Sequence, residues 1–456
     1  MNINDKRVLV LGLGISGVSA AKALTKLGAK VTVSDINPEE KLKDYIYEIK
    51  DMNLRMYLGT NDVPLDDIDL IVKSPGIPLT IDIIKEANRR NIEVITDLEL
   101  AYRICPDKNF IAITGTNGKT TTTTLTGELF KGAGIKTHVS GNIGVGILWD
   151  LVNSNEDDVF VIEASSFQLE STKYFKPKVS VIINITPDHL NWHGTYENYI
   201  NAKKKIFINQ TEKEYTVLNY DDKILRQIGE EVNSNLIWFS VDNKLSKGAY
   251  IDDGYVVIND GKEVHRIVRT DEIKILGKHN LENVLASVSV GWIMGLDNGI
   301  MGDVIRNFKG VEHRIEFVDT INGVEFYNDS KGTNPDASIK AILAVNPPII
   351  LIAGGKDKGS EFGEFVESFG DRVKSLVLLG ETKEKIRDTA LKYGFKNIHM
   401  VNNMKEAVYK SFEISQPGDS VLLSPACASW DMYSNFEMRG HDFKRAVKSL
   451  KEAKNV

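Results

Sequence analysis

The sequence predicts an α/β protein of three domains, and three observations lead to this prediction. The first is length, because 456 residues are about three times a typical domain of ~150 residues. The second is the alternation of short β-branched runs with helical stretches, which is typical of parallel sheets. The third is a pair of glycine-rich turns, each lying between a predicted strand and a predicted helix.

The first domain is predicted over residues 1–98 as a Rossmann-like unit. Its predicted strands are RVLVLG, KVTVSD, DLIVKS and IEVIT, with helices from Val18 to Leu27 and from Ile81 to Asn91. The first turn reads GLGISG from Gly12 to Gly17, and Asp35 ends the second strand. Such glycines let backbone N–H groups approach a diphosphate, and the carboxylate can accept from a ribose hydroxyl. The turn therefore indicates a nucleotide ligand, the alternative being a tight turn without one.

The second domain is predicted over residues 99–310, with a parallel sheet and a P-loop of the ATPase type. Its predicted strands are FIAITG, KTHVS, DVFVIEAS, KVSVIINI and YTVLNY. Between Lys247 and Ile275, short strands alternate with DDG and NDG turns, which predict a small antiparallel meander packed onto this domain. A helix is expected from about Asn280 to Met294.

The second glycine-rich turn reads TGTNGKTT and follows the strand FIAIT. Consecutive N–H groups of such a loop cradle phosphate oxygens, the lysine neutralises charge between the outer phosphates, and the hydroxyl after it can ligate Mg²⁺. Ile113 stands where the usual pattern has its first glycine, which disfavours an ordinary kinase or GTPase. The predicted nucleotide contacts are Gly115, Thr116, Asn117, Gly118, Lys119, Thr120 and Thr121.

The third domain is predicted over residues 311–456 as another Rossmann-like α/β unit. It opens with a hairpin, RIEFVDTINGVEFYND, whose turn is Asn322-Gly323. The runs PIILIAGG, KSLVLLG, NIHMV and DSVLLS then alternate with helical stretches. The last domain is therefore expected to be mainly parallel after its hairpin.

Composition excludes several classes of protein. A net charge of −7 leaves no global positive field for nucleic acid. No stretch approaches ~18 uninterrupted apolar residues, so no membrane span is expected. Cys105 and Cys427 fit no disulfide framework, which favours a reducing compartment, the cytoplasm.

Two nucleotide loops in one chain suit an enzyme that holds a nucleotide-tagged substrate together with ATP. The chain resembles the Mur ligase family over nearly its whole length, and most of all the members that add D-glutamate. The resemblance lies in these motifs, in order: GLGISG, SPGI, TGTNGKTT, SGNIG, EASSFQLE, NITPDHLNWHG, GKHNLEN, EHRIE, NDSKGTNPDA, AGGKDKG and SPACASWDMYSNFEMRG.

The resemblance implies a monomeric, ATP-dependent ligase of peptidoglycan synthesis. Such an enzyme joins UDP-N-acetylmuramoyl-L-alanine to D-glutamate through an acyl phosphate, which needs clustered cations and exclusion of water. Four alternatives stay open: the L-alanine-adding ligase, folylpolyglutamate synthase, an NAD dehydrogenase that uses GLGISG, and a non-catalytic UDP-sugar sensor. The last motif favours the D-glutamate enzyme.

The resemblance also implies roles for individual residues. The catalytic set is Lys119, Lys203, His313 and Lys331. Two Mg²⁺ ions are expected on Thr120, Glu163, His189 and a carbamylated Lys203, while Asn280, Asn283, Arg314 and Asp329 would complete the ATP site. The UDP sugar would contact Ser16, Asp35, Gly76 and Asn142, and D-glutamate would contact Lys331, Thr333, Lys358, Ser429 and Phe436. Uracil contacts at Ile36-Asn37 and the choice between Lys356 and Lys358 stay open.

Lys203 also stands out from the residues themselves. In TYENYINAKKKIFIN, helical spacing puts Lys203 on one otherwise apolar face with Tyr196, with Tyr199 or Ile200, and with Phe207. Burial lowers the pKa of an amine, and a neutral amine can react with CO₂ to form an anionic carbamate that binds Mg²⁺. The carbamylated lysine of the family falls at this position. The competing interpretation is a lysine whose stem follows the core while its ammonium reaches water.

Overall fold

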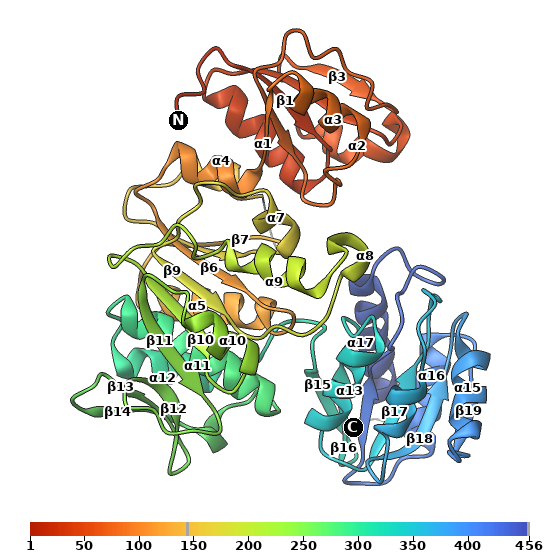
Figure 1. Ribbon diagram of the computed structural model, residues 1–456. Helices are drawn as coiled ribbons and strands as arrows, with labels where there is room; N and C mark the ends of the chain where they lie inside the picture. Colours follow the sequence, from red (N-terminus) through yellow and green to blue (C-terminus); the bar gives the residue numbers. More distant parts are fainter. Residues whose placement is uncertain (143–145, 454–456) are drawn as a thin grey trace. The chain divides into compact units, whose positions relative to one another are not determined.

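The computed structural model describes residues 1–142 and 146–453 and confirms the predicted α/β class, with three sheets in the described residues (Figure 1). The chain divides into two compact units, Met1–Glu272 with Leu281–Arg306 and Ile273–Asn280 with Asn307–Val456. The first unit holds two of the sheets and the second unit holds the third. The boundaries near residues 98 and 310 stay a proposal.

The first sheet contains five strands, β1 (Arg7–Leu11), β2 (Lys30–Asp35), β3 (Arg55–Leu58), β4 (Leu70–Lys73) and β5 (Glu93–Thr96). They are parallel, in the order β3-β2-β1-β4-β5. Four helices accompany them: α1 (Ile15–Lys26), α2 (Glu39–Tyr47), α3 (Asp82–Arg89) and α4 (Asp97–Ile104). The sequence analysis did not predict β3, because this edge strand is short, half exposed and has no β-branched residue.

The second sheet contains nine strands. They are β6 (Asn109–Thr114), β7 (Thr137–Gly141), β8 (Val159–Glu163), β9 (Val179–Ile182), β10 (Tyr215–Asn219), β11 (Asn235–Ser240), β12 (Gly248–Asp252), β13 (Tyr255–Asn259) and β14 (Val264–Arg269). Their order is β14-β13-β12-β11-β10-β9-β6-β8-β7. Because β6 lies between β8 and β9, the loops after these three parallel strands leave the same edge of the sheet.

The antiparallel meander exists, but it is not a separate layer on the domain. Its first strand, β12, pairs in parallel with β11, and β13 and β14 follow in antiparallel pairing. The meander therefore extends the parallel sheet. The sequence analysis missed β11, the strand that joins the two parts, although its run Leu236 to Phe239 has the branched and aromatic side chains typical of strands.

The helices of this region position the loops of the sheet. They are α5 (Lys119–Gly132), α6 (Ile147–Leu151), α7 (Ser166–Glu170), α8 (Leu190–His193), α9 (Tyr196–Lys204), α10 (Lys223–Gly229), η1 (Thr270–Glu272), α11 (Lys278–Ile293) and α12 (Asn298–Asn307). Helix α11 begins two residues before the expected Asn280. Helix α9 ends at Lys204, so Phe207 lies beyond the helix whose face it was predicted to share, although it is buried.

The third sheet contains β15 (Glu316–Ile321), β16 (Val324–Asn328), β17 (Ile349–Ala353), β18 (Val373–Leu378), β19 (Ile398–Met400) and β20 (Ser420–Leu423). Their order is β15-β16-β20-β17-β18-β19, parallel except for the β15–β16 hairpin. The hairpin turns at Asn322-Gly323, both with positive φ, as predicted. The helices are α13 (Pro335–Ala344), α14 (Gly363–Glu367), α15 (Lys383–Lys392), α16 (Met404–Glu413) and α17 (Phe436–Ala453).

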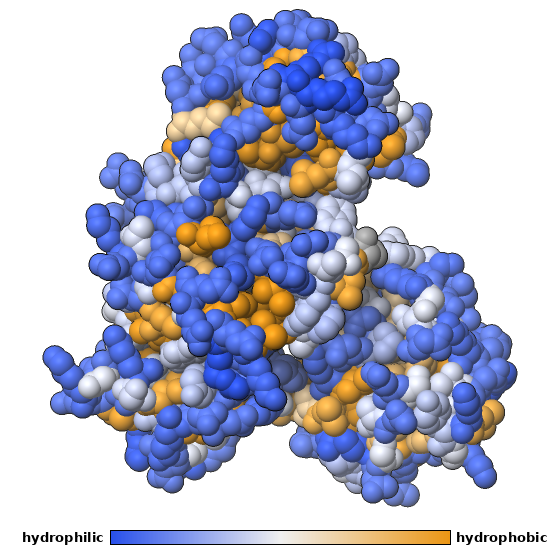
Figure 2. All heavy atoms as spheres, viewed as in Figure 1, coloured by the Kyte–Doolittle hydropathy of each residue, from blue (hydrophilic) through white to orange (hydrophobic). Residues whose placement is uncertain are grey.

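The apolar runs of the three sheets form the cores. Strands β6, β8 and β17 are buried along most of their length, as expected for parallel strands covered on both faces. On the face drawn in Figure 2, hydrophilic side chains cover most of the surface and apolar side chains gather in smaller patches. Among the described residues, no helix has the length and apolar character needed to cross a membrane.

A buried glutamate ties helix α4 to the segment between α7 and β9. Glu99 of α4 is fully buried and accepts from the backbone N–H groups of Lys173, Tyr174 and Phe175 at 2.9–3.0 Å. It also accepts from Arg103 Nε at 2.6 Å. The terminal nitrogens of the same arginine pair with Glu93, whose side chain is 38% exposed. One arginine therefore contacts a buried carboxylate and a half-exposed one.

We expect Glu99→Gln to lower the free energy of unfolding by about 2–4 kcal/mol, because the amide leaves buried N–H groups without an acceptor. Glu93→Gln, the matched control on the same arginine, should cost less than about 1 kcal/mol, because water solvates that pair. Urea denaturation of both variants measures the difference. Equal losses would contradict the structural role given to Glu99.

Candidate functional site

The second glycine-rich turn lies between β6 and α5, where the sequence predicted a phosphate loop. Gly118 has φ +84°, and a Cβ there would lie 2.3 Å from Asn283 Oδ1. The loop is held by Asn184, whose carbonyl accepts from Thr116 N at 3.0 Å and whose side chain accepts from Asn117 N at 2.9 Å. Lys119 Nζ donates to the carbonyls of Gly115 at 2.8 Å and of Thr116 at 2.9 Å. The loop is thus preformed around its lysine.

Asn280 and Asn283, both predicted for the ATP site, contact different parts of the chain. Asn283 is buried and accepts from Thr122 Oγ1 at 3.1 Å, so it packs against the helix of the phosphate loop. Asn280 lies in the first turn of α11 and donates to Leu276 O at 2.7 Å. Asn283 therefore supports the loop, whereas Asn280 orders the chain before α11.

Lys203 is buried beside the same loop, 1% exposed. Its Nζ donates to Gly115 O at 2.8 Å and to Thr114 Oγ1 at 3.3 Å, and it lies 4.7 Å from the centre of the Tyr199 ring. Burial first, and then the charge of Lys119, hold the pKa of the Lys203 amine well below its usual range. The amine therefore gives up its proton more readily than that of an exposed lysine. Its neighbour Lys204 instead pairs with Glu231 at the surface.

A buried carboxylate ends the neighbouring strand β8. Glu163 is 2% exposed, and its Oε1 accepts from Asn142 Nδ2 at 2.9 Å. Its Oε2 has no hydrogen-bond partner within residues 1–142 and 146–453. A buried, unpartnered carboxylate oxygen is expensive unless a ligand completes it. Asn142, predicted to contact the UDP sugar, thus also orients Glu163. Ile143 and Gly144, from the same motif, lie outside the described residues.

His189 follows β9 in a left-handed conformation, with φ +52°. Burial lowers the pKa of its imidazole, and the charges of Lys119 and Lys203 lower it further. The Asp188 carboxylate, whose Oδ2 lies 3.4 Å from His189 Nε2, acts in the opposite direction. The ring is therefore neutral at physiological pH, the form that binds metals. The neighbouring His193 is fully enclosed, with Nε2 3.0 Å from Ser166 Oγ and its ring stacked on Phe167.

In the first domain, the predicted substrate residues lie on adjoining turns. Gly12 has φ +96°, and a Cβ on Gly17 would lie 2.0 Å from Gly12 O, so the close turn requires both glycines. Asp35 accepts from Leu13 N at 2.7 Å and from Asn37 N at 2.8 Å. Its carboxylate therefore holds the glycine turn together.

Open space lies beside Gly76 and beside Ile36. Among the described residues, no atom outside its chain neighbours lies within 4 Å of a Cβ built on Gly76. Ile36, which follows Asp35, lines a cavity of about 800 Å³ together with apolar side chains such as Val63 and charged ones such as Asp62 and Arg90. The lining of this cavity is therefore mixed in polarity.

In the second unit, Asp329 follows β16 and is buried. Its Oδ2 accepts from Ser424 Oγ at 2.7 Å and its Oδ1 from Ile315 N at 3.3 Å. Burial raises the pKa of its carboxyl to about 7, against the Ser424 hydrogen bond and the charge of Arg314. The carboxyl is therefore about half protonated at neutral pH.

The predicted D-glutamate residues gather around two aromatic rings. Lys331 Nζ lies 5.6 Å from the centre of the Phe436 ring, and Lys358 Nζ lies 4.5 Å from that of Trp430. Lys356 instead pairs with Glu381 at 2.7 Å, which favours Lys358 for a ligand. The remaining two predicted residues are Thr333, whose N–H donates to Lys331 O, and Ser429, which is buried after the SPACA turn.

Sequence reasoning missed Arg439, which connects these segments. Its guanidinium is buried and donates to Ser330 Oγ and O, at 3.0 and 2.8 Å, and to the carbonyls of Cys427 and Ala428, at 3.0 and 3.2 Å. It thereby joins the loop of Lys331 to the loop of Ser429. Arg439 is part of the motif SPACASWDMYSNFEMRG. The residues that it contacts lie more than a hundred residues away or on another loop, so the motif alone did not indicate its role.

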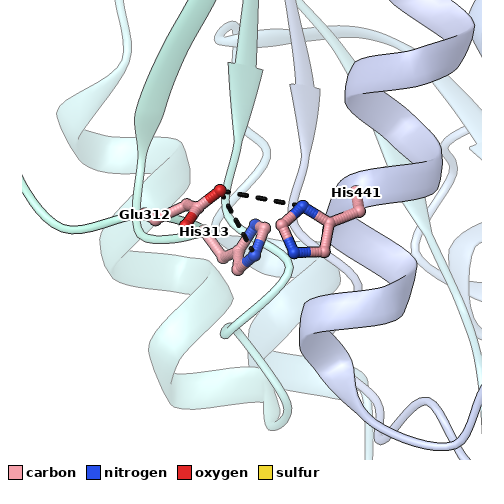
Figure 3. A group of neighbouring side chains, drawn as sticks. All are labelled: Glu312, His313 and His441. Carbon is pink, nitrogen blue, oxygen red and sulfur yellow. Dashed lines mark ion pairs between the residues drawn. The ribbon is translucent and has the colours of Figure 1, made fainter. Parts of the chain in front are cut away.

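His313 lies among Glu312 and His441, as Figure 3 shows. Asn328 Nδ2 donates to His313 Nδ1 at 2.9 Å, because Asn328 Oδ1 is taken by Ser330 N. The hydrogen of the neutral ring is therefore assigned to Nε2, which is buried and has no hydrogen-bond partner in the part of the chain that the structure describes. Glu312 Oε1 lies 3.9 Å from this nitrogen and 3.7 Å from His441 Nδ1.

The position of this hydrogen determines which ligands the cluster of Glu312, His313 and His441 can bind. A metal needs a nitrogen lone pair, whereas His313 Nε2 presents an N–H. Lys444 also already pairs with Glu312 and with Glu316. The trio is therefore unsuited to a metal, and His313 Nε2 is a donor suited to an anionic oxygen.

Comparison with known proteins gives matches along the whole chain. Models of three protein domains match it: the Mur ligase MurD-like N-terminal domain over residues 6–96, the Mur ligase middle domain over 113–291, and the Mur ligase glutamate ligase domain over 313–427. Among solved structures, the UDP-N-acetylmuramate-alanine ligase of Thermotoga maritima matches with a TM-score of 0.62 at 19% identity, over 98% of this chain and 100% of that one. A pseudomurein peptide ligase type C from Methanothermus fervidus matches with a TM-score of 0.60 at 20% identity, over the same shares of each chain. These structures support the fold alone.

Curated relatives are far more similar in sequence. The UDP-N-acetylmuramoylalanine--D-glutamate ligase of Thermoanaerobacter sp. (strain X514) is 51% identical over 99% of this chain and 100% of its own length. The protein of the same name from Clostridioides difficile (strain 630) is 48% identical over the same shares. On this full-length similarity, the chain belongs to the Mur ligase family.

Proposed function

We propose that this chain is an ATP-dependent ligase that joins UDP-N-acetylmuramoyl-L-alanine to D-glutamate in peptidoglycan synthesis. The observation that carries the proposal is the 48–51% identity, over 99% of the chain, to relatives named for this reaction. The similarity includes the third domain, which distinguishes D-glutamate from other acceptors. The geometry of the described residues supports the chemistry at each step.

The reaction has two steps. The substrate carboxylate attacks the outer phosphate of ATP, which forms an acyl phosphate and releases ADP; the amine of D-glutamate then attacks the acyl carbon and releases phosphate. Lys119 would exchange its bonds to the loop carbonyls for bonds to phosphate oxygens. His313 Nε2 and Arg314 offer further donors to the transferred phosphate, and Asp329 would accept from the ribose.

The residues around the phosphate loop fit a divalent cation. The unpartnered Glu163 Oε2 and the neutral His189 ring are the observations that support this fit. Thr120, Glu163, His189 and Lys203 would hold two Mg²⁺ ions, which would supply positive charge at the phosphate oxygens. Glu163 and His189 lie after β8 and β9, on either side of the strand that carries the loop.

Lys203 would contribute as a carbamate. Its neutral amine adds to CO₂ and loses one proton, which gives the anionic N-carboxylate. The low pKa of the amine supports this step, because only the neutral amine is a nucleophile. The anion would also replace repulsion with Lys119 by attraction.

The third domain would receive D-glutamate. Lys331 and Lys358 supply two cations for its carboxylates, each beside an aromatic ring that orients the ammonium. Thr333 and Ser429 add polar groups, and Phe436 forms one wall. In the first domain, the glycine turn with Ser16 and Gly76 would bind the diphosphate, and the exposed Ile36 would lie against uracil.

The proposal predicts that ADP release requires both UDP-N-acetylmuramoyl-L-alanine and D-glutamate, with L-glutamate and L-alanine poor acceptors. A coupled ADP assay with a panel of amino acids measures this. Equal turnover with L-glutamate or L-alanine would refute the assignment.

The same assay separates the two lysines of the AGGKDKG motif. Lys358→Met should raise KM for D-glutamate about tenfold or more, because a charged hydrogen bond to the acceptor is lost. Lys356→Met, the matched control, should change it less than about threefold, because that ammonium pairs with Glu381.

Lys203→Ala should lose nearly all turnover, whereas Lys204→Ala, whose side chain lies at the surface, should keep it. Carbamylation has its own readout. Protein equilibrated with ¹³C-bicarbonate should show one carbamate ¹³C signal that Lys203→Ala lacks and Lys204→Ala retains. Full activity of Lys203→Ala, or the same signal in both variants, would contradict the carbamate.

A further inference from the structure

A second buried lysine lies in the first domain and has no part in the chemistry above. Lys73 ends β4 and is 1% exposed. Because buried parallel strands are usually apolar, an ammonium group at this position is unusual. Its Nζ donates to Ile77 O at 3.0 Å and to Pro75 O at 3.4 Å. Both carbonyls belong to the turn that carries Gly76. The ammonium group of Lys73 therefore links this turn to β4.

The surroundings of Lys73 connect it with the glycine turn. Ser16, Gly17, Ser74 and Asp97 line the same small cavity as Lys73. Ser74 Oγ also donates to Gly12 O at 3.3 Å, so the two turns are joined directly. The two loops proposed for the diphosphate thus share one buried cation.

The negative charges that act on Lys73 come from two helices. They are Asp97 at the start of α4 and Glu170 at the end of α7. Asp97 is buried and accepts from Leu98 N at 2.9 Å and from Gln168 Nε2 at 3.5 Å. Neither carboxylate is paired with the ammonium by a salt bridge among the described residues. The positive charge is therefore incompletely compensated within the protein.

We propose that Lys73 is a positioning residue for the diphosphate of the sugar nucleotide: it fixes the Gly76 turn and places a positive charge beneath the two glycine-containing loops. Burial without a paired carboxylate is costly in the free protein, and an incoming dianion would recover part of that cost. This inference rests on the proposed function and goes beyond it, because it gives a role to a residue that contacts only protein groups.

The proposal has a consequence for pH. Burial lowers the pKa of the Lys73 amine to about 8, against the charges of Glu170 and Asp97. The ammonium is present below that pH and is lost above it. Because an anionic ligand binds the ammonium form more tightly, the affinity for the sugar nucleotide should fall as the pH rises through about 8.

The experiment measures Kd of UDP-N-acetylmuramoyl-L-alanine by calorimetry, without ATP, between about pH 6 and pH 10. Lys73→Met should weaken binding about tenfold at pH 7 and remove the decline around pH 8. Kd for ADP should not change. The uracil ring of the ligand also titrates in alkaline solution, and this affects the wild-type protein and Lys73→Met equally. The ratio of their Kd values therefore reports the effect of Lys73 alone.

A second variant keeps the test decisive if Lys73→Met does not fold. Glu170→Gln removes the larger of the two charges that favour the ammonium while it preserves an acceptor for Trp192 Nε1. It should move the midpoint of the decline to lower pH. A Kd profile that is flat around pH 8 in the wild-type protein, or unchanged in Glu170→Gln, would overturn the proposal.

The outcomes for the two proposals are distinct. Absence of any binding of the sugar nucleotide would refute the proposed function. Tight binding that Lys73→Met and Glu170→Gln leave unchanged would refute only the role of Lys73.

Discussion

Two lysines donate to one carbonyl oxygen, and the chemistry of the site depends on this contact. Gly115 O accepts from Lys119 Nζ and from Lys203 Nζ, each at 2.8 Å. Two ammonium groups that share one acceptor repel one another, and only one of them is buried completely. Burial first, and then the charge of Lys119, therefore lower the pKa of the Lys203 amine. The phosphate loop thus places a buried amine of lowered pKa next to its own lysine.

The fold makes this contact possible through the order of its strands. Since β6 lies between β8 and β9, the phosphate loop, Glu163 and His189 leave one edge of one sheet. Strain and buried polarity occur at such edges: His189 and His313 have positive φ, and Glu163 Oε2 and His313 Nε2 are buried without partners among the described residues. These groups are costly in the free protein, and under the proposed function bound ions would offset that cost.

Much of the architecture was predictable because its signals are local. Branched runs and glycine turns identified most strands, and the Asn322-Gly323 turn identified the hairpin. The signal failed at β3, an exposed edge strand without β-branched residues. It also failed at β11, the strand that makes the meander continuous with the sheet.

The site was predictable in part. The motifs predicted which residues would contact ligands. They did not predict which residues hold those ligand-contacting residues in place. Asn184, Arg439 and Lys73 matter through partners that only the folded chain brings close. Asp35 and Asn142 were predicted as ligand contacts, and in the structure they also organise protein groups, the glycine turn and Glu163. Hydrogen-bond partners of this kind cannot be inferred from spacing, whereas the burial of a lysine on an apolar helix face can.

The most direct measurement is the titration of the Lys203 amine itself, by NMR of ¹³C-labelled lysine in CO₂-free solution, in the wild-type protein and in Lys119→Met. The shared carbonyl predicts a midpoint well below the ordinary lysine value of about 10.4 and an upward shift when the Lys119 charge is removed. A midpoint near the ordinary value, or one that does not respond to Lys119→Met, would contradict the account.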